Sequence, residues 1–402
     1  MEPACITRFR EYLQVNTMQP NPDYAGCEKY LKKQAEEIGL EFKSLELVPG
    51  KPTIIMTWRG FDPTLKSLIL NSHTDVVPVF EEFWDYPPFS ATRVPTDNGD
   101  FRIYARGSQD MKIVGSCYLE AIRNLKEHGK NPLRTIHLLF VPDEEIGGED
   151  GMMKFLHTPE FKEMNAGFAL DEGIANPGPE LYAFYGERTN NAVKFTCRGN
   201  TGHGSQFITD TAVSKLLNIS RELTEFRNEE EQRLISKYGE VNQSNLGFVT
   251  TVNLNIINGG VQVNVVPDNF QAEFDIRVSP DTDLEEFNLW LKGLAEKYDS
   301  EIEYPHEVVR SGVSDIGPSN KFYHKMVEVL DAKELKIINA IFPAATDSRY
   351  LRAAGIPAIG ISPLRNIPVL LHVHNEYVTE SLFMEGVDIY TDLIHELSNL
   401  EG

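Results

Sequence analysis

The chain has 402 residues, of which 41% are hydrophobic and 24% are charged, and these proportions are typical of a globular protein too long for a single core. Its 60 acidic residues against 38 basic ones give a net charge of −22, which repels phosphate backbones and argues against nucleic acid as a partner. Its four cysteines are widely spaced, its N-terminal segment lacks the pattern of a signal peptide, and no apolar run reaches the roughly 18 residues of a membrane span. We therefore expect a cytoplasmic protein with reduced thiols.

The first half of the chain alternates strand and helix patterns. Short apolar runs that end in polar loops predict strands at 53–58, 67–71, 135–141 and 167–170. Residues 111–130 place apolar side chains at helical spacing, as in the crossover helix of a parallel or mixed sheet. This half is therefore predicted to be of the α/β class.

From about Asn190 the pattern changes to that of a separate α+β unit. Helical spacing at 211–237 and 284–298 accompanies strand-like segments at 247–257, 261–266 and 270–278. After Gly312 the α/β style returns, with helices near 322–330 and 382–400 and strands at 336–339 and 358–361. We predict a discontinuous, mixed-sheet α/β domain of residues 1–187 and 309–402, interrupted by an inserted α+β domain of residues 188–308.

A histidine and an aspartate directly follow the predicted strand 67–71. Extended backbone points alternate residues to the same side, so His73 and Asp75 can reach one site. A metal-binding imidazole usually gives its other N–H to a carboxylate, and Asp75 is placed to be that group. Taken alone, the pair also fits a strand-end histidine with a chance neighbour.

Other strand ends and one helix-entry loop carry similar groups. These candidates are Asp110 in the loop before the helix at 111–130, Glu144 and Glu145 after the strand 135–141, Asp171 after the strand 167–170, and His372 near the C-terminus. Each has a plain alternative, since Asp110 can cap a helix and the acidic run can be a solvated turn. Together they match the site that an α/β sheet builds at its carboxyl edge. Two imidazoles and three carboxylates without a thiolate suit zinc, in sufficient number for two ions that share one carboxylate.

The motifs S-H-T-D-V-V-P at 72–78, A-R-G-S-Q-D-M-K at 105–112, P-D-E-E-I-G-G at 142–148, A-L-D-E-G at 169–173 and L-H-V-H-N-E at 371–376 resemble the aminoacylase, carboxypeptidase G and desuccinylase family of two-zinc metallopeptidases. The resemblance implies two Zn²⁺ per subunit, one held by His73, Asp110 and Asp171 and the other by Asp110, Glu145 and His372. It also implies that Glu144 is the general base and that Asp75 orients His73.

The same resemblance assigns roles outside the metal ligands. In this family the inserted domain is a lid and dimerisation module, and a glycine-flanked histidine reaches the neighbouring subunit's site. His203, in T-G-H-G-S at 201–205, matches that histidine, and Asn264 and Arg349 match residues that hold the substrate. From the residues alone, His203 would be interpreted as an exposed loop histidine, and the alternative for Arg349 is a surface arginine at a helix start.

The resulting expectation is a homodimeric, zinc-dependent hydrolase that converts N-acyl-L-amino acids into a carboxylate and a free amino acid. Glu144 would deprotonate the attacking water and protonate the leaving nitrogen. Two alternatives stay open: a dipeptidase or carboxypeptidase of the same family, and a non-enzymatic binding protein that keeps the fold.

Overall fold

The computed structural model describes residues 2–306, 308–310 and 312–401. It divides into two compact units, the first made of Met1–Tyr185, Ser314–Asn339 and Thr346–Gly402 and the second of Gly186–Val313 and Ala340–Ala345. Residues 340–345, which the sequence-based prediction assigned to the first domain, lie in the second unit. Among the described residues, no helix has both the length and the hydrophobicity needed to cross a membrane.

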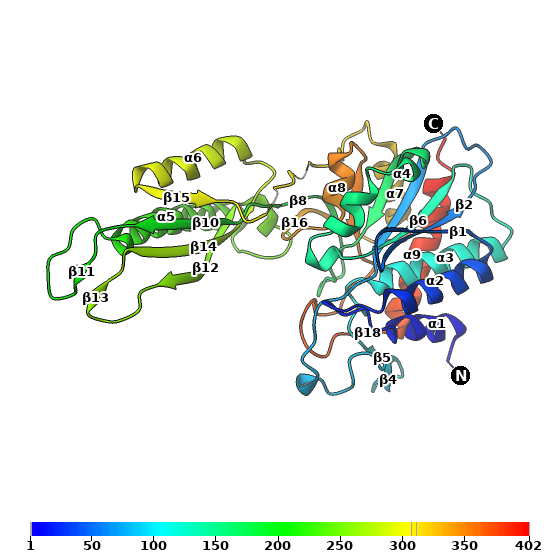
Figure 1. The fold of residues 1–402 in the computed structure, drawn as a ribbon. Coiled ribbons are helices and arrows are strands. Elements are labelled where there is room, and N and C mark those ends of the chain that lie inside the picture. The colour runs from blue at the N-terminus through cyan, green and yellow to red at the C-terminus, as the bar shows by residue number, and fades with distance from the viewer. Residues whose placement is uncertain (1, 307, 311, 402) are drawn as a thin grey trace. The chain divides into compact units, whose positions relative to one another are not determined.

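An eight-stranded mixed sheet organises the first unit (Figure 1). Its strands, in spatial order, are β1 (Glu41–Val48), β2 (Lys51–Trp58), β6 (Ile136–Val141), β3 (Ser67–His73), β7 (Ala166–Asp171), β17 (Ala358–Ile361), β8 (Leu181–Glu187) and β16 (Ile337–Phe342). The central strands β6, β3, β7 and β17 run parallel, whereas β1 with β2, β2 with β6 and β17 with β8 are antiparallel. The predicted mixed α/β sheet is confirmed.

Burial explains why the central strands were visible in the sequence. All seven residues of β3 and all six of β6 are buried. Strands that are covered on both faces read as continuous apolar runs, unlike the alternating pattern of a half-exposed strand. These two strands therefore place their carboxyl ends side by side inside a rigid layer.

Helices cover the sheet and complete the core. α1 (Ala4–Leu13), α2 (Tyr24–Ile38), α3 (Lys112–Glu127), α7 (Lys321–Ala332) and α9 (Glu380–Ser398) pack against one another in a chain of contacts that includes β3. At the centre of this layer, Tyr118 of α3 meets Tyr390 of α9 edge to face at 4.8 Å. Shorter elements complete the unit: α4 (Pro159–Glu163), α8 (Ser348–Ala353) and a small sheet of β4 (Thr92–Pro95), β5 (Phe101–Tyr104) and β18 (Tyr377–Thr379).

The second unit is an antiparallel sheet with two long helices. Its strands are β12 (Thr251–Gly259), β14 (Asn269–Val278), β10 (Val193–Arg198) and β15 (Ser300–Glu303) in that order, with β9 (Thr189–Asn190) beside β14 and a separate pair of β11 (Gly202–His203) and β13 (Val265–Val266). α5 (Ala212–Tyr238) and α6 (Leu284–Lys297) bury Leu216 and Leu291 against Phe195 and Phe274 of the sheet. This unit has the predicted α+β character and its own core.

Local chemistry fixes where the long helices begin. The hydroxyl of Thr211 accepts from Ser214 N at the start of α5, and Asp283 accepts from the backbone of Glu285 and Glu286 at the start of α6. Such caps satisfy N–H groups that have no partner inside the helix. The predicted strand at 261–266 is wrong in extent, because only Val265–Val266 pair, after Gly259 and Gly260 turn the chain with positive φ.

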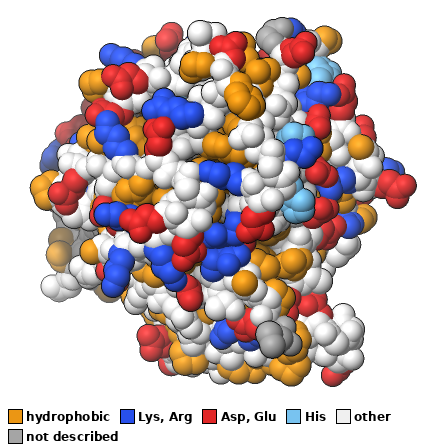
Figure 2. All heavy atoms as spheres, turned by 90° about the vertical axis from the view of Figure 1, so that its right-hand side faces the viewer, with side chains coloured by type: hydrophobic (Ala, Val, Ile, Leu, Met, Phe, Trp, Pro, Cys, Tyr) orange, Lys and Arg blue, Asp and Glu red, His pale blue; other side chains and the backbone are white. Residues whose placement is uncertain are grey.

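Acidic and basic side chains are interspersed over the face of the molecule that Figure 2 shows. The excess of acidic residues is therefore not gathered into one patch on that face, as expected for a solvated surface.

Candidate metal centre

Three adjacent parallel strands deliver polar side chains to one edge of the sheet. His73 is the last residue of β3, Glu144 and Glu145 lie in the 3₁₀ turn that follows β6, and Glu172 follows β7. Because the carboxyl ends of parallel strands meet at one edge, these side chains converge. With Asp110 and His372 from two loops, they form what we call the strand-end cluster.

His73 is held in the tautomer of a metal ligand. Its Nδ1 lies 2.9 Å from the backbone carbonyl oxygen of Asp75, and a carbonyl can only accept, so Nδ1 carries the hydrogen. Nε2 faces Asp110 Oδ1 at 3.1 Å and Glu172 Oε2 at 3.3 Å, and it donates to these carboxylates when the ring is protonated. When the ring is neutral, its lone pair is on Nε2, which is then the nitrogen that can bind a metal ion.

Asp75 acts differently from the sequence-based expectation. Its backbone carbonyl holds the imidazole, whereas its carboxylate lies 3.7 Å from His73 Nδ1. The carboxylate instead accepts from the backbone N–H groups of Glu144 at 3.1 Å and Glu145 at 3.2 Å, and from Gln19 Nε2 at 2.9 Å. One residue thus positions both the histidine and the acidic turn.

Asp110 lies between the two imidazoles. Its Oδ1 is 3.1 Å from His73 Nε2, and its Oδ2 is 3.2 Å from His372 Nε2. His372 Nε2 is also 3.2 Å from Glu145 Oε2. Burial would raise the pKa of Asp110, but hydrogen bonds from the two imidazoles hold it well below its usual range. A carboxylate that offers each oxygen to a different imidazole has the arrangement of a bridging ligand.

Glu172, and not Asp171, reaches the cluster. Both carboxylate oxygens of Asp171 are already engaged, Oδ1 by Asn71 Nδ2 at 2.9 Å and Oδ2 by Ser348 Oγ at 2.7 Å. Sequence reasoning missed Glu172 because Asp171 and Glu172 are adjacent and only one can face the site. Alternation could not have identified Glu172, since Asn71 and His73 point to the same side of β3 and Asn71 is the hydrogen-bond partner of Asp171.

The acids of the cluster are crowded and buried. Burial, followed by the charge of Glu172, raises the pKa of Glu144 well above its usual range, and burial raises that of Glu172 in the same way. Burial and the charge of Asp110 raise the pKa of Glu145 to about 7. Hydrogen bonds to Asp110 and Glu145 raise the pKa of His372 to about 10. Such like-charge crowding favours a site that takes a cation.

The donor set fits divalent metal ions. Within the cluster, ligand atoms of His73, Glu144 and Glu172, and likewise of His73, Asp110 and Glu145, lie within 4.8 Å of one another. Glu145 Oε1 is buried without a hydrogen-bond partner. In the part of the chain that the structure describes, the carboxylates of the cluster pair only with the imidazoles and with no lysine or arginine. Nitrogen and oxygen donors without thiolate match zinc and similar ions.

The predicted substrate arginine lies beside the acidic turn. Arg349, in α8, donates from Nη2 to the carbonyl of Gly147 at 2.7 Å and from Nη1 to that of Thr346 at 2.6 Å. Tyr350 donates its hydroxyl to the same carbonyl of Gly147 at 2.6 Å. The guanidinium is therefore fixed next to the turn that carries Glu144 and Glu145.

His203 and Asn264 belong to the second unit and lie close to each other. His203, the last residue of β11, pairs with Val265 of β13, and Gly204 N donates to the carbonyl of Asn264 at 2.9 Å. The imidazole is exposed, with Nδ1 2.8 Å from Ser205 Oγ. The structure thus places these two predicted residues side by side at one small two-stranded sheet.

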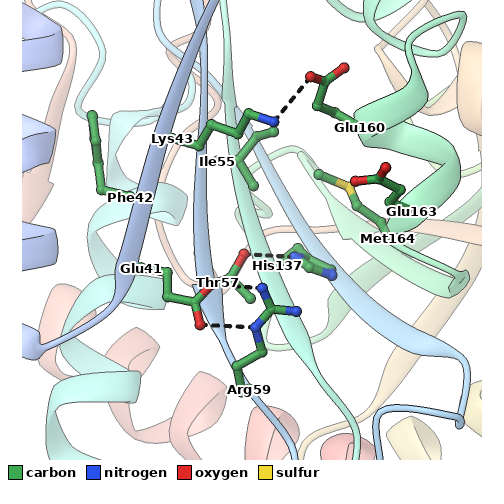
Figure 3. Close-up of a pocket in the computed structure, with 10 residues that line it drawn as sticks. All are labelled: Glu41, Phe42, Lys43, Ile55, Thr57, Arg59, His137, Glu160, Glu163 and Met164. Carbon is green, nitrogen blue, oxygen red and sulfur yellow. Dashed lines mark hydrogen bonds and ion pairs between the residues drawn. The ribbon is translucent and has the colours of Figure 1, made fainter.

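Another imidazole among acids lies elsewhere in the first unit, in a cavity of about 350 Å³ between β1, β2, β6 and α4 (Figure 3). We call it the α4 pocket. His137 forms part of its wall, with Nδ1 3.0 Å from Thr57 Oγ1. Two of its three acids are neutralised: Glu41 takes a bidentate pair from Arg59, and Glu160 pairs with Lys43 at 3.0 Å, while Glu163 is exposed to solvent. This pocket therefore lacks the buried, uncompensated carboxylates of the strand-end cluster.

The sheet and the strand-end cluster together define a hydrolase-type α/β protein with a metal centre at the carboxyl edge of its sheet. The family model described as peptidase family M20/M25/M40 matches residues 69–396. The chain belongs to this family. It is 45% identical to "Aminoacylase-1" of Mus musculus, over 99% of this chain and 96% of that protein.

Solved structures agree on the fold. An M20 family metallo-carboxypeptidase from Sulfolobus solfataricus superposes with a TM-score of 0.76 at 19% identity, over 99% of this chain and all of that one. A dinuclear metal binding peptidase of the M20 family from Bacillus subtilis gives a TM-score of 0.67 at 14% identity, over 99% and 98% of the two chains.

Proposed function

We propose that the protein hydrolyses N-acyl-L-amino acids to a carboxylate and a free L-amino acid, as a metal-dependent amidohydrolase. The observation that carries the proposal is the strand-end cluster, in which buried carboxylates and two imidazoles converge without a lysine or arginine partner among the described residues. The 45% identity with a relative named aminoacylase-1 supports the acyl-amino-acid substrate.

The metals in this proposal are two zinc ions. His73, Asp110 and Glu172 would hold one, and Asp110, Glu145 and His372 the other, with Glu172 in the place that sequence reasoning gave to Asp171. The supporting geometry is the pair of Asp110 oxygens, each facing its own imidazole. When bound, zinc supplies a Lewis acid that polarises the acyl carbonyl and lowers the pKa of water.

Glu144 is the proposed general base. Its Oε2 lies 3.9 Å from His73 Nε2, farther than the nearest oxygens of Asp110 and Glu172, so its carboxylate is the one best placed to face a water instead of a metal. It takes the proton of the attacking water and returns it to the leaving nitrogen. Asp75 holds the Glu144 backbone in place through its carboxylate.

Groups around the cluster would bind the substrate. Arg349 is proposed to hold the carboxylate of the amino acid, because a guanidinium recognises a carboxylate bidentately. Asn264 would contact the substrate, and His203 would donate a hydrogen bond to the oxyanion in the active site of the partner subunit. In this proposal the second unit, close to residues 188–308, acts as lid and dimerisation module.

The edge strand β12 supports the homodimer. It lies at one end of the second unit's sheet, and its apolar side chains Leu254, Ile256 and Ile257 are 38%, 46% and 55% exposed. An exposed apolar edge offers unpaired backbone groups to a second strand. A second copy of this chain, joined edge to edge, would bury it. We also place the protein in the cytoplasm, because its four cysteines carry free thiols.

The test is release of methionine from N-acetyl-L-methionine by purified protein, before and after chelation and after return of zinc. We expect turnover that is lost with the chelator and restored by zinc. If the zinc-loaded protein leaves N-acetyl-L-methionine intact but cleaves dipeptides, the proposed substrate class is wrong while the proposed metal centre is retained. Binding of a partner without hydrolysis of either would favour a non-enzymatic protein.

A further inference from the structure

Two loops bring Asp110 and His372 together, and each is tied to the other by buried polar side chains. The aspartate loop comprises residues 105–111, and the histidine loop comprises residues 368–377. Asp110 Oδ2 lies 3.2 Å from His372 Nε2 across them. Neither loop is part of the main sheet, so their separation depends on the contacts between them.

The histidine loop sends a carboxylate into the aspartate loop. Glu376 is fully buried, and its carboxylate accepts from the backbone N–H of Gln109 at 2.6 Å and from those of Gly107 and Asp110 at 3.3 Å. Arg106 completes this environment with an ion pair to Glu376 at 2.8 Å. Glu376 thus fixes the backbone of the residue that faces both imidazoles.

The aspartate loop in turn contacts the histidine loop through the side-chain amide of Gln109. Gln109 Nε2 donates to the carbonyls of Pro368 at 3.2 Å and Tyr377 at 2.9 Å, and its Oε1 accepts from Leu370 N at 3.0 Å. The amide therefore spans both ends of the histidine loop. Since Gln109 is 2% exposed, these bonds are shielded from water.

The position of His372 needs such support. Its φ is 61°, a left-handed conformation that non-glycine residues rarely adopt, and its side chain is 55% exposed. Packing alone does not hold an exposed imidazole. The Arg106 guanidinium also donates to the carbonyl of Val373 at 3.1 Å, next to His372 in the chain.

We propose that Gln109 and Glu376 are positioning residues, a reciprocal clasp that sets the separation of Asp110 and His372 and thereby the affinity for the metal ion that these two residues share. The inference rests on the proposed metal centre and goes beyond its ligands and base. The clasp acts on the metal only through Asp110 and His372, because neither positioning side chain lies among the ligand atoms of the cluster.

The test is the zinc dissociation constant of the Glu376→Gln variant, measured by competition with a chromophoric chelator. The amide keeps the size of the side chain, but its NH2 group cannot accept hydrogen bonds from the backbone N–H groups of the aspartate loop. We therefore expect zinc to bind about 10-fold to 100-fold more weakly, which is the range seen when groups that orient metal ligands are lost. N-acetyl-L-methionine turnover should fall at limiting zinc and recover as zinc is raised. A purely structural role would lower stability without this rescue.

A matched control is Glu120→Gln. Glu120 is 4% exposed and takes a bidentate pair from Arg8 at 2.6 and 2.5 Å, so the variant also breaks a partly buried ion pair of the first unit. It should bind zinc as tightly as the unmodified protein. Equal weakening of zinc binding in both variants would overturn the clasp.

A second variant covers a failure of Glu376→Gln to fold. Gln109→Met keeps the volume and leaves Glu376 in place, but removes all three amide contacts to the histidine loop, and should also bind zinc at least about 10-fold more weakly. Unchanged zinc affinity in a folded variant would refute the clasp while the proposed function stands. If the unmodified protein binds no zinc, both the clasp and the proposed metal-dependent function are refuted, because the clasp is proposed to act only on metal binding.

Discussion

The strand-end cluster and the α4 pocket both place a buried imidazole among carboxylates, and they differ in what compensates the acids. In the α4 pocket, Arg59 and Lys43 pair with Glu41 and Glu160 (Figure 3). In the strand-end cluster, the only ion-pair partners of the carboxylates among the residues that the structure describes are imidazoles. The cations of the pocket are supplied by the chain itself, whereas the cluster leaves a place for ions from outside.

The two histidines show the same contrast in their pKa values. Burial, followed by the nearby charge of Arg59, lowers the pKa of His137 to about 4, so this imidazole stays neutral. For His73, burial acts in the same direction, but hydrogen bonds to Asp110 and Glu172 outweigh it and raise the pKa well above the usual range. The lesson is that burial alone does not decide the state of an imidazole; the unpaired acids around it do.

The largest effect is expected for Glu144→Gln. The amide cannot accept the proton of the attacking water, so turnover of N-acetyl-L-methionine should fall about 10³-fold, within the range of general base catalysis. Metal analysis should find the zinc content unchanged, because Glu144 is not among the proposed ligands. Loss of zinc together with activity would show that Glu144 is a ligand.

A smaller effect separates Glu172 from Asp171. We expect Glu172→Gln to weaken zinc binding by at least about 100-fold, since the variant removes a ligand and not merely an orienting group. Asp171→Asn should cost at most about 10-fold, because Asp171 bonds Asn71 and Ser348 and lies outside the cluster. Chelator competition gives both constants. The reverse order would restore Asp171 as the ligand.

This pair of acids also shows how far the sequence could lead. The continuous apolar runs of β3 and β6 and the polar residues behind them predict the sheet edge and most of the cluster, because order along a buried strand dictates where its end lies. Which of two neighbouring acids faces inward depends on partners brought by other segments, such as Ser348. That information is tertiary and is not present in local spacing.

Elements with mixed faces were harder to predict. The sequence patterns assign no element to α2 or β1, and both are partly polar: α2 buries Gln34 beside Leu31, and β1 is nowhere fully buried. Periodicity is a weak signal when the buried stripe contains polar residues. The clasp formed by Gln109 and Glu376 could not be predicted from local patterns either. The two residues, which are joined by a hydrogen bond from Gln109 N to the Glu376 carboxylate, lie 267 positions apart in the sequence.

The next effect concerns the stability of the protein in acid. Because the pKa of His137 is about 4 in the folded chain and its ordinary value is 6.5, the unfolded chain binds more protons between these values, and stability must fall as the pH drops through that window. When the pH is lowered from 7 to 5, the free energy of unfolding of the His137→Asn variant should therefore fall by about 2 kcal/mol less than that of the unmodified protein. Urea unfolding at the two pH values measures this difference. Parallel losses would show that His137 is accessible to protons in the folded state.

The smallest effect is expected for Arg59→Gln in the same pocket. The pair of Arg59 with Glu41 is exposed, with 65% and 56% of the two side chains accessible, so its loss should cost less than about 1 kcal/mol at pH 7. Its influence on His137 has the opposite sign, because removing a positive charge lets the pKa of His137 rise toward its ordinary value and narrows the acid-sensitive window. The variant should thus be slightly less stable at pH 7 yet lose less stability on going to pH 5. Turnover of N-acetyl-L-methionine should be unchanged, since the α4 pocket takes no part in the proposed chemistry. If an NMR titration of the variant shows no upward shift in the pKa of His137, then burial alone sets that pKa.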